Sequence, residues 1–268
     1  MKIYVFGTRG FPNIQGGVEK HCEELYTSMP SIYDITIFRR KPFINSDKTY
    51  KNIHFIDLPT VRTKGIEALL HSFLCVLYCI GKRPNIIHVH NIGPGLFIPL
   101  LKIVGLKVVL TYHSPNYEHD KWSYLAKKGL KVCEYIAIKG ADKIIFVNKL
   151  QLQKFNPSIQ AKSYYIPNGI KEKKEIKDIS FISSLGLSPF QYILTVGRIT
   201  PEKGFDYLIK AYNLMHNKSD KLVIAGGCDH TSAYAKQLIA EARKSQVVLA
   251  GYMNEDQLNH LYTYARLF

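Results

Sequence analysis

The sequence predicts an α/β protein in which parallel β-sheets are covered by helices, divided into two domains. Short apolar runs of strand length alternate along the chain with longer segments of helical period, a pattern typical of such sheets. The length of 268 residues permits two modest domains, each with its own core. With 46% hydrophobic and 21% charged residues, the composition is that of an ordinary globular protein, which excludes a disordered chain, a collagen and a coiled coil.

The first domain is expected over residues 1–170, because the alternation is regular there. The predicted strands are Lys2–Phe6, Asp34–Phe38, Ile53–Asp57, Ile86–His90, Lys107–Tyr112, Lys143–Val147 and Tyr164–Ile166. The predicted helices are Val18–Met29, Ile66–Gly81, Leu96–Val104 and Trp122–Lys139.

A charged polar stretch that begins at Lys171 predicts a linker over residues 171–190. The alternation restarts in a second domain over residues 191–268, whose last residues, Arg266–Phe268, have the pattern of an opening fourth strand. The predicted elements of this domain are strands Tyr192–Val196, Lys221–Ala225 and Val247–Ala250 and helices Phe205–Met215, Ser232–Lys244 and Glu255–Ala265.

The net charge is +15, and most of it belongs to the first domain. Residues 1–170 hold 23 Lys and Arg against 11 Asp and Glu, a net charge of +12, whereas the remainder carries +3. A field of this sign attracts anionic partners such as phosphates, nucleic acids or acidic lipid headgroups. No recognition motif for nucleic acid accompanies the charge, so nucleic acid is not an expected partner.

Cysteine usage and hydropathy predict a cytoplasmic protein. The five cysteines are odd in number and lack paired spacing, which indicates reduced core residues. The longest apolar run, Ala68–Ile80, is shorter than the roughly 18 residues that a spanning helix needs. The first seven residues lack the apolar region of a secretion signal.

A glycine-bearing loop, Gly7–Gly17, follows the first strand and opens the first helix. Glycines there let backbone N–H groups approach an oxyanion at the helix N-terminus, where the helix dipole favours negative charge. A nicotinamide-dinucleotide site is not predicted, because the G-x-G-x-x-G spacing is missing and the second strand runs into Arg39-Arg40-Lys41 without an acidic residue. The alternative is a flexible loop that binds no ligand.

A second phosphate-binding candidate, Gly197–Gly204, follows the first strand of the second domain. Arg198 offers a planar fork for phosphate oxygens, and Lys203 places a point charge where the next helix begins. Two cations across one strand-to-helix turn could hold a diphosphate. The alternative is a solvated surface loop.

Histidines are expected at the carboxyl ends of strands, where ligands bind in open α/β sheets. His113 follows one strand and could donate a hydrogen bond to a sugar hydroxyl, or it could be an ordinary polar cap. His88 and His90 alternate on another strand, with Asn91 following; no carboxylate or cysteine completes a metal-ligand set, so no metal site is predicted.

Together these segments resemble, in the family's order, the retaining, nucleotide-sugar-dependent glycosyltransferases of the GT-B fold, called group 1 or family 4. The motifs are G-G-V-E at Gly16–Glu19, H-V-H-N at His88–Asn91, T-Y-H-S at Thr111–Ser114, I-P-N-G at Ile166–Gly169 and G-R-I-x-x-E-K-G at Gly197–Gly204, continued by Gly226-Gly227 and Gly251-Tyr252. The opening G-T-R-G-F-P-N-I-Q-G-G is similar to a subgroup that includes rhamnosyltransferases of bacterial surface polysaccharide synthesis.

The resemblance implies two Rossmann-like domains that face each other across a cleft, the acceptor largely on the first and the donor largely on the second. It implies catalytic roles for His113, Arg198 and Lys203: His113 bonds the donor sugar, and the two cations hold the diphosphate. It implies no metal and no cofactor, since the nucleotide-sugar is itself the substrate. The other implied residues are Gly16, Gly17, Gly227, Gly251 and Tyr252 for donor binding and Glu19, His90 and Asn91 on the acceptor side.

One departure from the family concerns its E-x7-E element, whose glutamates support catalysis and hold the donor ribose. By the order of motifs this element would follow the segment that ends at Phe268. The second domain is therefore expected to be incomplete and the chain a fragment with little transferase activity.

The function expected from the resemblance is transfer of a sugar, of hexosyl type and with retention, from a nucleotide-sugar to a glycan or lipid-linked acceptor. Two alternatives stay open: a nucleotide-sugar epimerase on the same fold, and a non-catalytic fragment that binds nucleotide-sugar or a partner. Lysines interleaved with aromatic residues over Lys121–Lys128, beside the apolar helix Ile66–Gly81, suggest peripheral attachment to the anionic inner face of the plasma membrane. A solvated face over a core helix would give the same pattern.

Overall fold

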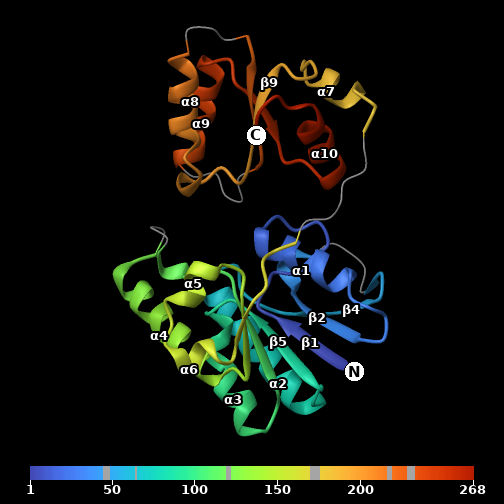
Figure 1. Cartoon of the computed structure of the whole chain (residues 1–268), viewed down its shortest axis with the longest axis vertical. Coiled ribbons are helices and arrows are strands. Elements are labelled where there is room, and N and C mark those ends of the chain that lie inside the picture. Colours follow the sequence, from blue (N-terminus) through green and yellow to red (C-terminus); the bar gives the residue numbers. More distant parts are fainter. Residues whose placement is uncertain (45–48, 64, 119–121, 170–175, 216–218, 228–232) are drawn as a thin grey trace. The chain divides into compact units, whose positions relative to one another are not determined.

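The computed structural model describes residues 1–44, 49–63, 65–118, 122–169, 176–215, 219–227 and 233–268, which divide into two compact units. The first unit is Met1–Lys171 and the second is Glu172–Phe268 (Figure 1). Predictions that fall on Lys121, on residues 171–175 of the linker, on Ser232 and on Cys228 lie outside the described residues.

An eight-stranded sheet with the order β3-β4-β2-β1-β5-β6-β7-β8 forms the centre of the first unit. All neighbouring strands are parallel except β3, a two-residue antiparallel edge strand that the sequence analysis did not predict. The strands are β1 (Lys2–Phe6), β2 (Asp34–Arg40), β3 (Thr49–Tyr50), β4 (Ile53–Leu58), β5 (Ile86–His90), β6 (Val108–Tyr112), β7 (Lys143–Phe146) and β8 (Ser163–Tyr165).

Helices cover both faces of this sheet because the strands alternate two apolar sets of side chains. In β1, Ile3 and Val5 join the core under helix α1 (Gly17–Thr27), whereas Phe6 joins the core on the opposite face. That opposite face is covered by α2 (Ile66–Lys82), α3 (Ile98–Ile103) and α4 (Tyr124–Gly140), and α3 packs against both of the others. Two short helices, α5 (Lys149–Gln153) and α6 (Pro157–Gln160), pack near β7 and β8.

The second strand is longer than predicted, because two arginines that the analysis had placed beyond it are buried and paired. The guanidinium group of Arg39 donates to both carboxylate oxygens of Asp57 at 2.7 and 2.9 Å, and Arg40 pairs with Glu67 at 2.9 Å. Both arginines are less than 10% exposed. Part of the +12 charge of this region therefore lies inside the protein.

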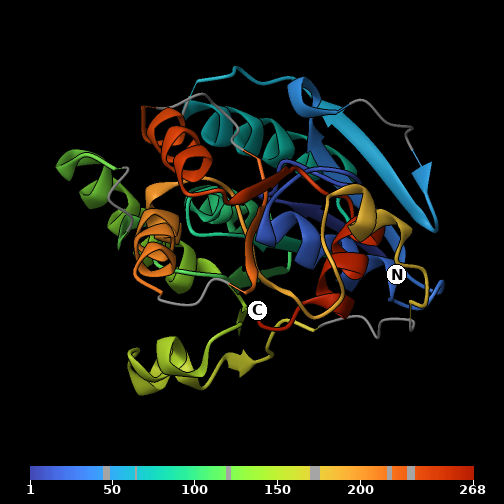
Figure 2. The ribbon, with the colours of Figure 1, turned by 90° about the horizontal axis from the view of Figure 1, so that it is seen from above.

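The second unit is a three-stranded parallel sheet with the order β11-β10-β9. Its strands are β9 (Tyr192–Val196), β10 (Lys221–Ala225) and β11 (Val248–Gly251). Helices α8 (Phe205–Asn213) and α9 (Ala233–Lys244) cover one face and lie side by side (Figure 1, Figure 2). Helices α7 (Ser180–Ser184) and α10 (Glu255–Tyr264) cover the other.

Two predictions about this unit are settled by its packing. The linker prediction over residues 171–190 was too long, since α7 lies within it and Ile182 and Leu187 are buried in the core of the second unit. The predicted opening of a fourth strand is confirmed, because Leu267 forms a parallel bridge with Ile193 beside β9.

The helices of the described residues include none that is both long and apolar enough to cross a membrane.

Candidate functional site

Three turns converge at the carboxyl edge of the second sheet, where β9, β10 and β11 end. Backbone hydrogen bonds join them: Gly197 N–H donates to the carbonyl of Ala225 at 3.0 Å, Ile199 N–H to that of Gly227 at 3.0 Å, and Gly226 N–H to that of Gly251 at 2.7 Å. The sequence places a glycine in each turn, and the structure brings these glycines together. Main-chain atoms of the three turns therefore lie next to one another along this edge of the sheet.

Glycine is required at the closest approach of two turns. Gly226 has φ of 152°, and a Cβ added there would collide with the carbonyl oxygen of Gly197. A side chain at position 226 would push the two turns apart.

Two cationic side chains belong to the first of these turns and to the segment that follows it. Arg198 is the second residue after β9 and is half-buried, and Lys203 is exposed at the end of a 3₁₀ turn that leads into α8. The aliphatic stem of Lys203 crosses Gly197, whose ideal Cβ would lie 3.3 Å from Lys203 Cε. Gly204, with φ of 65°, ends the turn and caps α8. Arg198 and Lys203, which were predicted to hold a diphosphate, thus lie at the same edge of the sheet as Gly227, Gly251 and the 54% exposed Tyr252.

A long loop over residues 7–16 forms the corresponding feature of the first unit. Gly7, with φ of 110°, packs against the backbone of His90, and Asn91 Nδ2 donates to the Gly7 carbonyl at 3.1 Å. Gly10, with φ of 119°, packs against the side chain of the buried Arg39. The loop is therefore fixed at two points before it reaches Gly16 and Gly17, where α1 begins.

Glu19 closes the loop from the other side. Its carboxylate accepts a hydrogen bond from Arg9 N–H at 3.1 Å, and it lies so close to Gly16 that a Cβ there would collide with it. The carboxylate also adds negative charge to the first turn of α1. The contacts in the structure give Glu19 and Asn91 a part in shaping the loop.

The His90 ring is fully buried, with 0% exposure, and its acceptor-side role stays a prediction. The burial follows from the face of β5 on which it stands, because His88 and His90 point toward α1, which covers them. His113, one residue beyond β6, lies next to His90, with 3.0 Å between His90 Nδ1 and His113 Nε2.

A hydrogen-bonded series of side chains extends from His113 into the interior. Tyr26 Oη lies 2.7 Å from His90 Nε2 and 2.8 Å from His88 Nδ1, and His88 Nε2 lies 2.7 Å from Thr111 Oγ1. Tyr26 and Thr111 were not predicted from the sequence as members of this site. The available signal was the two-residue alternation of His88 with His90 and of Thr111 with His113 on adjacent strands.

Burial keeps these imidazoles neutral. Desolvation lowers the pKa of His88 and of His113 to about 3, and it holds the pKa of His90 well below its usual value. Neighbouring histidines lower all three further. At neutral pH each ring therefore has one N–H donor and one lone pair.

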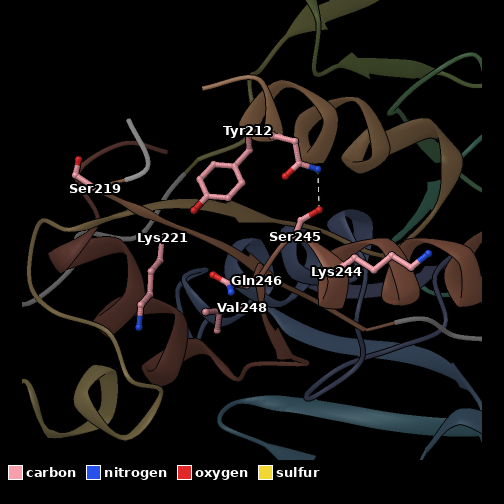
Figure 3. Close-up of a pocket in the computed structure, with 8 residues that line it drawn as sticks. Tyr212, Ser219, Lys221, Lys244, Ser245, Gln246 and Val248 are labelled. Atoms are coloured by element: carbon pink, nitrogen blue, oxygen red, sulfur yellow. Dashed lines mark hydrogen bonds between the residues drawn. The ribbon is translucent and has the colours of Figure 1, made fainter. Parts of the chain in front are cut away.

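A pocket of about 700 Å³ lies elsewhere in the second unit, at the opposite end of the sheet (Figure 3). Lys221 and Val248, which begin β10 and β11, line it together with the ends of α8 and α9. Its polar groups bond within the protein: Asn213 Nδ2 donates to Ser245 Oγ at 2.7 Å, and Lys221 Nζ donates to the Gly186 carbonyl at 2.6 Å. None of the predicted site residues borders it.

Comparison with known proteins identifies the chain. Residues 15–174 match glycosyltransferase family 4, and residues 181–268 match the glycosyl transferases group 1 family. The chain belongs to the group 1 glycosyltransferases. An uncharacterized glycosyltransferase from Methanocaldococcus jannaschii is 31% identical over 98% of the chain and 72% of that relative.

The fold of this glycosyltransferase is GT-B, as predicted. Sucrose-phosphate synthase from Thermosynechococcus elongatus superimposes with a TM-score of 0.77 at 18% identity, over 98% of this chain and 73% of that one. Anabaena HepE, crystallised with UDP and glucose, superimposes with a TM-score of 0.71 at 14% identity, over 98% and 72% of the two chains.

Proposed function

We propose that this glycosyltransferase binds a nucleotide-sugar and transfers its sugar, as a hexosyl group and with retention, to a glycan or lipid-linked acceptor. The observation that carries the proposal is the convergence of three glycine turns with Arg198 and Lys203 at one edge of the second unit. Open main chain beside a guanidinium and an ammonium group suits a diphosphate. The similarity of the opening loop to rhamnosyltransferases extends the proposal to bacterial surface polysaccharide synthesis.

In the second unit, Arg198 would hold phosphate oxygens with its planar fork, and Lys203 would add a point charge. Because negative charge grows on the departing nucleoside diphosphate, these cations would stabilise the transition state more than the ground state. The reaction then requires neither a metal nor a cofactor. Gly227 and Gly251 would let the nucleotide approach the main chain, and the exposed ring of Tyr252 could pack on the base.

In the first unit, the N–H groups of Gly16 and Gly17 at the start of α1 would bind phosphate or sugar oxygens. His113, neutral at pH 7, would donate or accept a hydrogen bond at the donor sugar. Glu19 and Asn91 would hold the loop that carries the glycines, and His90 would orient His113 through their 3.0 Å contact.

The donor class is proposed from the relatives. The HepE structure contains UDP and glucose, which makes a uridine nucleotide the first donor to test. A thermal-shift panel of UDP, GDP, dTDP and their sugars should raise the melting temperature with one base far more than with the others. A panel without any stabilising nucleotide would contradict the proposal.

Product analysis separates transfer from the two alternatives. After incubation with the stabilising nucleotide-sugar and a lipid-linked acceptor, ¹H NMR should show a new glycosidic signal with the donor's anomeric configuration. A changed sugar that stays attached to the nucleotide would indicate epimerisation. An unchanged nucleotide-sugar would indicate a binding protein without catalysis.

We also propose that the first unit attaches to an anionic membrane surface. Exposed side chains of α4 form one helical stripe of aromatic, aliphatic and cationic groups, and Lys128 and Lys139 lie over the rings of Tyr124 and Tyr135. The neighbouring helices α2 and α3 lie on the same side of the sheet as α4 (Figure 1). They too expose apolar side chains. The exposed residues are Tyr124, Leu125, Val132 and Tyr135 on α4, Ile66, Leu69, Leu70, Phe73 and Leu77 on α2, and Leu100 and Ile103 on α3.

Co-sedimentation with vesicles tests this attachment. The protein should pellet with phosphatidylglycerol vesicles at low salt and stay in solution with phosphatidylcholine vesicles, because both lysines and apolar area are needed. Replacing Lys128 and Lys139 by Glu should abolish pelleting. The matched control replaces the exposed Lys210 and Lys236 of the second unit and should pellet normally.

A further inference from the structure

Three histidine rings meet at the carboxyl edge of the first sheet. His90 ends β5, His113 follows β6, and His21 lies on α1. One ring nitrogen of each lies within 4.8 Å of the others. No metal site was predicted here, because His88 and His90 alternate along one strand without a completing ligand, and His21 lies far from them in sequence.

The third ring carries a buried nitrogen with no partner. Among the described residues, no donor or acceptor is within hydrogen-bond reach of His21 Nε2. The ring planes of His21 and His113 meet at 79° with their centres 5.0 Å apart, so neither stacks on the other. A buried nitrogen of this kind loses the hydrogen bond that water would give it, and a bound ligand atom would restore a partner.

The rings are in the protonation state that a metal ion requires. Burial lowers the pKa of His21 and, more strongly, of His90 and His113. Metal ligation needs a neutral imidazole with a free lone pair, and at pH 7 these three rings have one each without loss of a proton.

The interior side chains supply the support that ligating histidines need. If His90 Nε2–H donates to Tyr26, then Tyr26 O–H donates to His88 Nδ1, and His88 Nε2–H donates to Thr111, over distances of 2.7, 2.8 and 2.7 Å. This direction leaves the Nδ1 lone pair of His90 facing His113. Histidines that bind metals usually donate their other N–H in this way, which fixes the tautomer and the ring orientation.

We propose that His21, His90 and His113 form a binding site for a divalent transition-metal ion, with Zn²⁺ the best match. Imidazole nitrogen suits zinc, copper, nickel and cobalt, and the set holds no carboxylate, which disfavours Mg²⁺ and Ca²⁺. In a tetrahedral zinc site with bonds of about 2.0–2.1 Å, donor nitrogens lie about 3.3 Å apart. His90 and His113 therefore need to separate slightly from 3.0 Å, and His21 needs to rotate toward them.

This metal site is additional to the proposed transfer reaction, and the two share His113. An ion bound by His113 would occupy the ring that we assign to the donor sugar, so metal and sugar would compete. The fourth position of the ion would be left for water or another ligand.

Isothermal titration of ZnCl₂ into the untagged chain, with no nucleotide present, tests the proposal. One Zn²⁺ ion per chain should bind, and Co²⁺ should give the visible absorption bands of tetrahedral coordination. His21→Ala should raise the Kd at least about 100-fold, because a three-ligand site becomes a two-ligand site. His21 is half-buried, so the variant should keep its fold, which far-UV circular dichroism checks.

Two further variants sharpen the result. Tyr26→Phe should raise the Kd about 10- to 100-fold, since the acceptor for His90 Nε2–H is lost. His54→Ala, an exposed histidine on β4, should bind Zn²⁺ as the wild type does. Absence of binding, or binding that His21→Ala leaves unchanged, would overturn the proposal. Because no nucleotide is present in this titration, a failure to bind Zn²⁺ would say nothing about donor binding. A failure to bind a nucleotide would likewise say nothing about the metal site.

Discussion

The buried ion pair of Arg39 and Asp57 holds the glycine loop of the first unit, and removing its carboxylate should destabilise that unit strongly. Arg39 is 0% exposed and donates two hydrogen bonds to Asp57 at 2.7 and 2.9 Å. Without the carboxylate, the guanidinium keeps a 3.4 Å contact with the Phe11 carbonyl and the ring of Phe55, 3.9 Å away. Breaking a buried ion pair by removing one partner costs about 3–5 kcal/mol, which is the loss expected for Asp57→Ala.

Urea unfolding followed by fluorescence measures this loss in the correct unit. Trp122 is the sole tryptophan and belongs to the first unit, so its emission reports that unit. The matched control is Lys102→Ala, which breaks the ion pair with Asp142, where the two side chains are 32% and 41% exposed. A solvated pair contributes at most about 1 kcal/mol. A loss for Asp57→Ala no larger than that of the control would refute the reasoning.

A double variant separates charge from packing. Arg39→Met with Asp57→Leu removes both charges and keeps apolar volume, so most of the lost stability should return. A double variant as unstable as Asp57→Ala would mean that the pair matters through its shape alone.

Two further predictions concern pH and the glycine loop. Burial lowers the pKa of His71 to about 4, so the folded state stays neutral while the unfolded state takes up a proton below about pH 6.5. As the pH is lowered from 6.5 to 4, the free energy of unfolding should therefore fall by up to about 1.4 kcal/mol per pH unit. In urea titrations, His71→Gln should remove this part of the pH dependence, whereas replacement of the exposed histidine in His54→Gln should leave it in place. Gly7→Ala places a Cβ on a residue with left-handed backbone and against the carbonyl of His90, so calorimetry should show a loss of stability of about 1–3 kcal/mol or more. In the control Gly17→Ala, the new Cβ would meet no atom within 4 Å, so this variant should melt as the wild type does.

Much of the fold could be predicted because buried parallel strands are short apolar runs. Strands β1, β5, β9 and β10 have the predicted bounds. In β1, β9 and β10 the apolar run ends where the strand ends. The end of β2 could not be found in this way. Arg39 and Arg40 look like the start of a polar loop, and only their partners on β4 and α2, distant in sequence, allow the strand to continue.

The residues of the candidate site also differ in how far the sequence alone predicts their arrangement. Gly197, Arg198, Lys203 and Gly204 lie in one eight-residue segment, so local spacing was sufficient to predict that turn. The approach of Gly226 and Gly251 to it depends on the strand order β11-β10-β9. The histidine cluster depends on topology: β5 lies beside β1, and α1 covers the face that carries His88 and His90. His21 on α1 therefore reaches His113 only through the fold, which no local pattern shows.

The central claim, that Arg198 and Lys203 hold the diphosphate of a nucleotide-sugar, is tested most directly by the affinity for the nucleotide that stabilises the protein. Each lost charge-assisted hydrogen bond is worth about 1.5–3 kcal/mol, so Arg198→Ala and Lys203→Ala should each raise the Kd about 10- to 100-fold in isothermal titration. Lys210→Ala, on helix α8, which follows the turn that carries Arg198 and Lys203, should bind as the wild type does. Variants at Arg198 and Lys203 that bind the nucleotide with wild-type affinity would contradict the account.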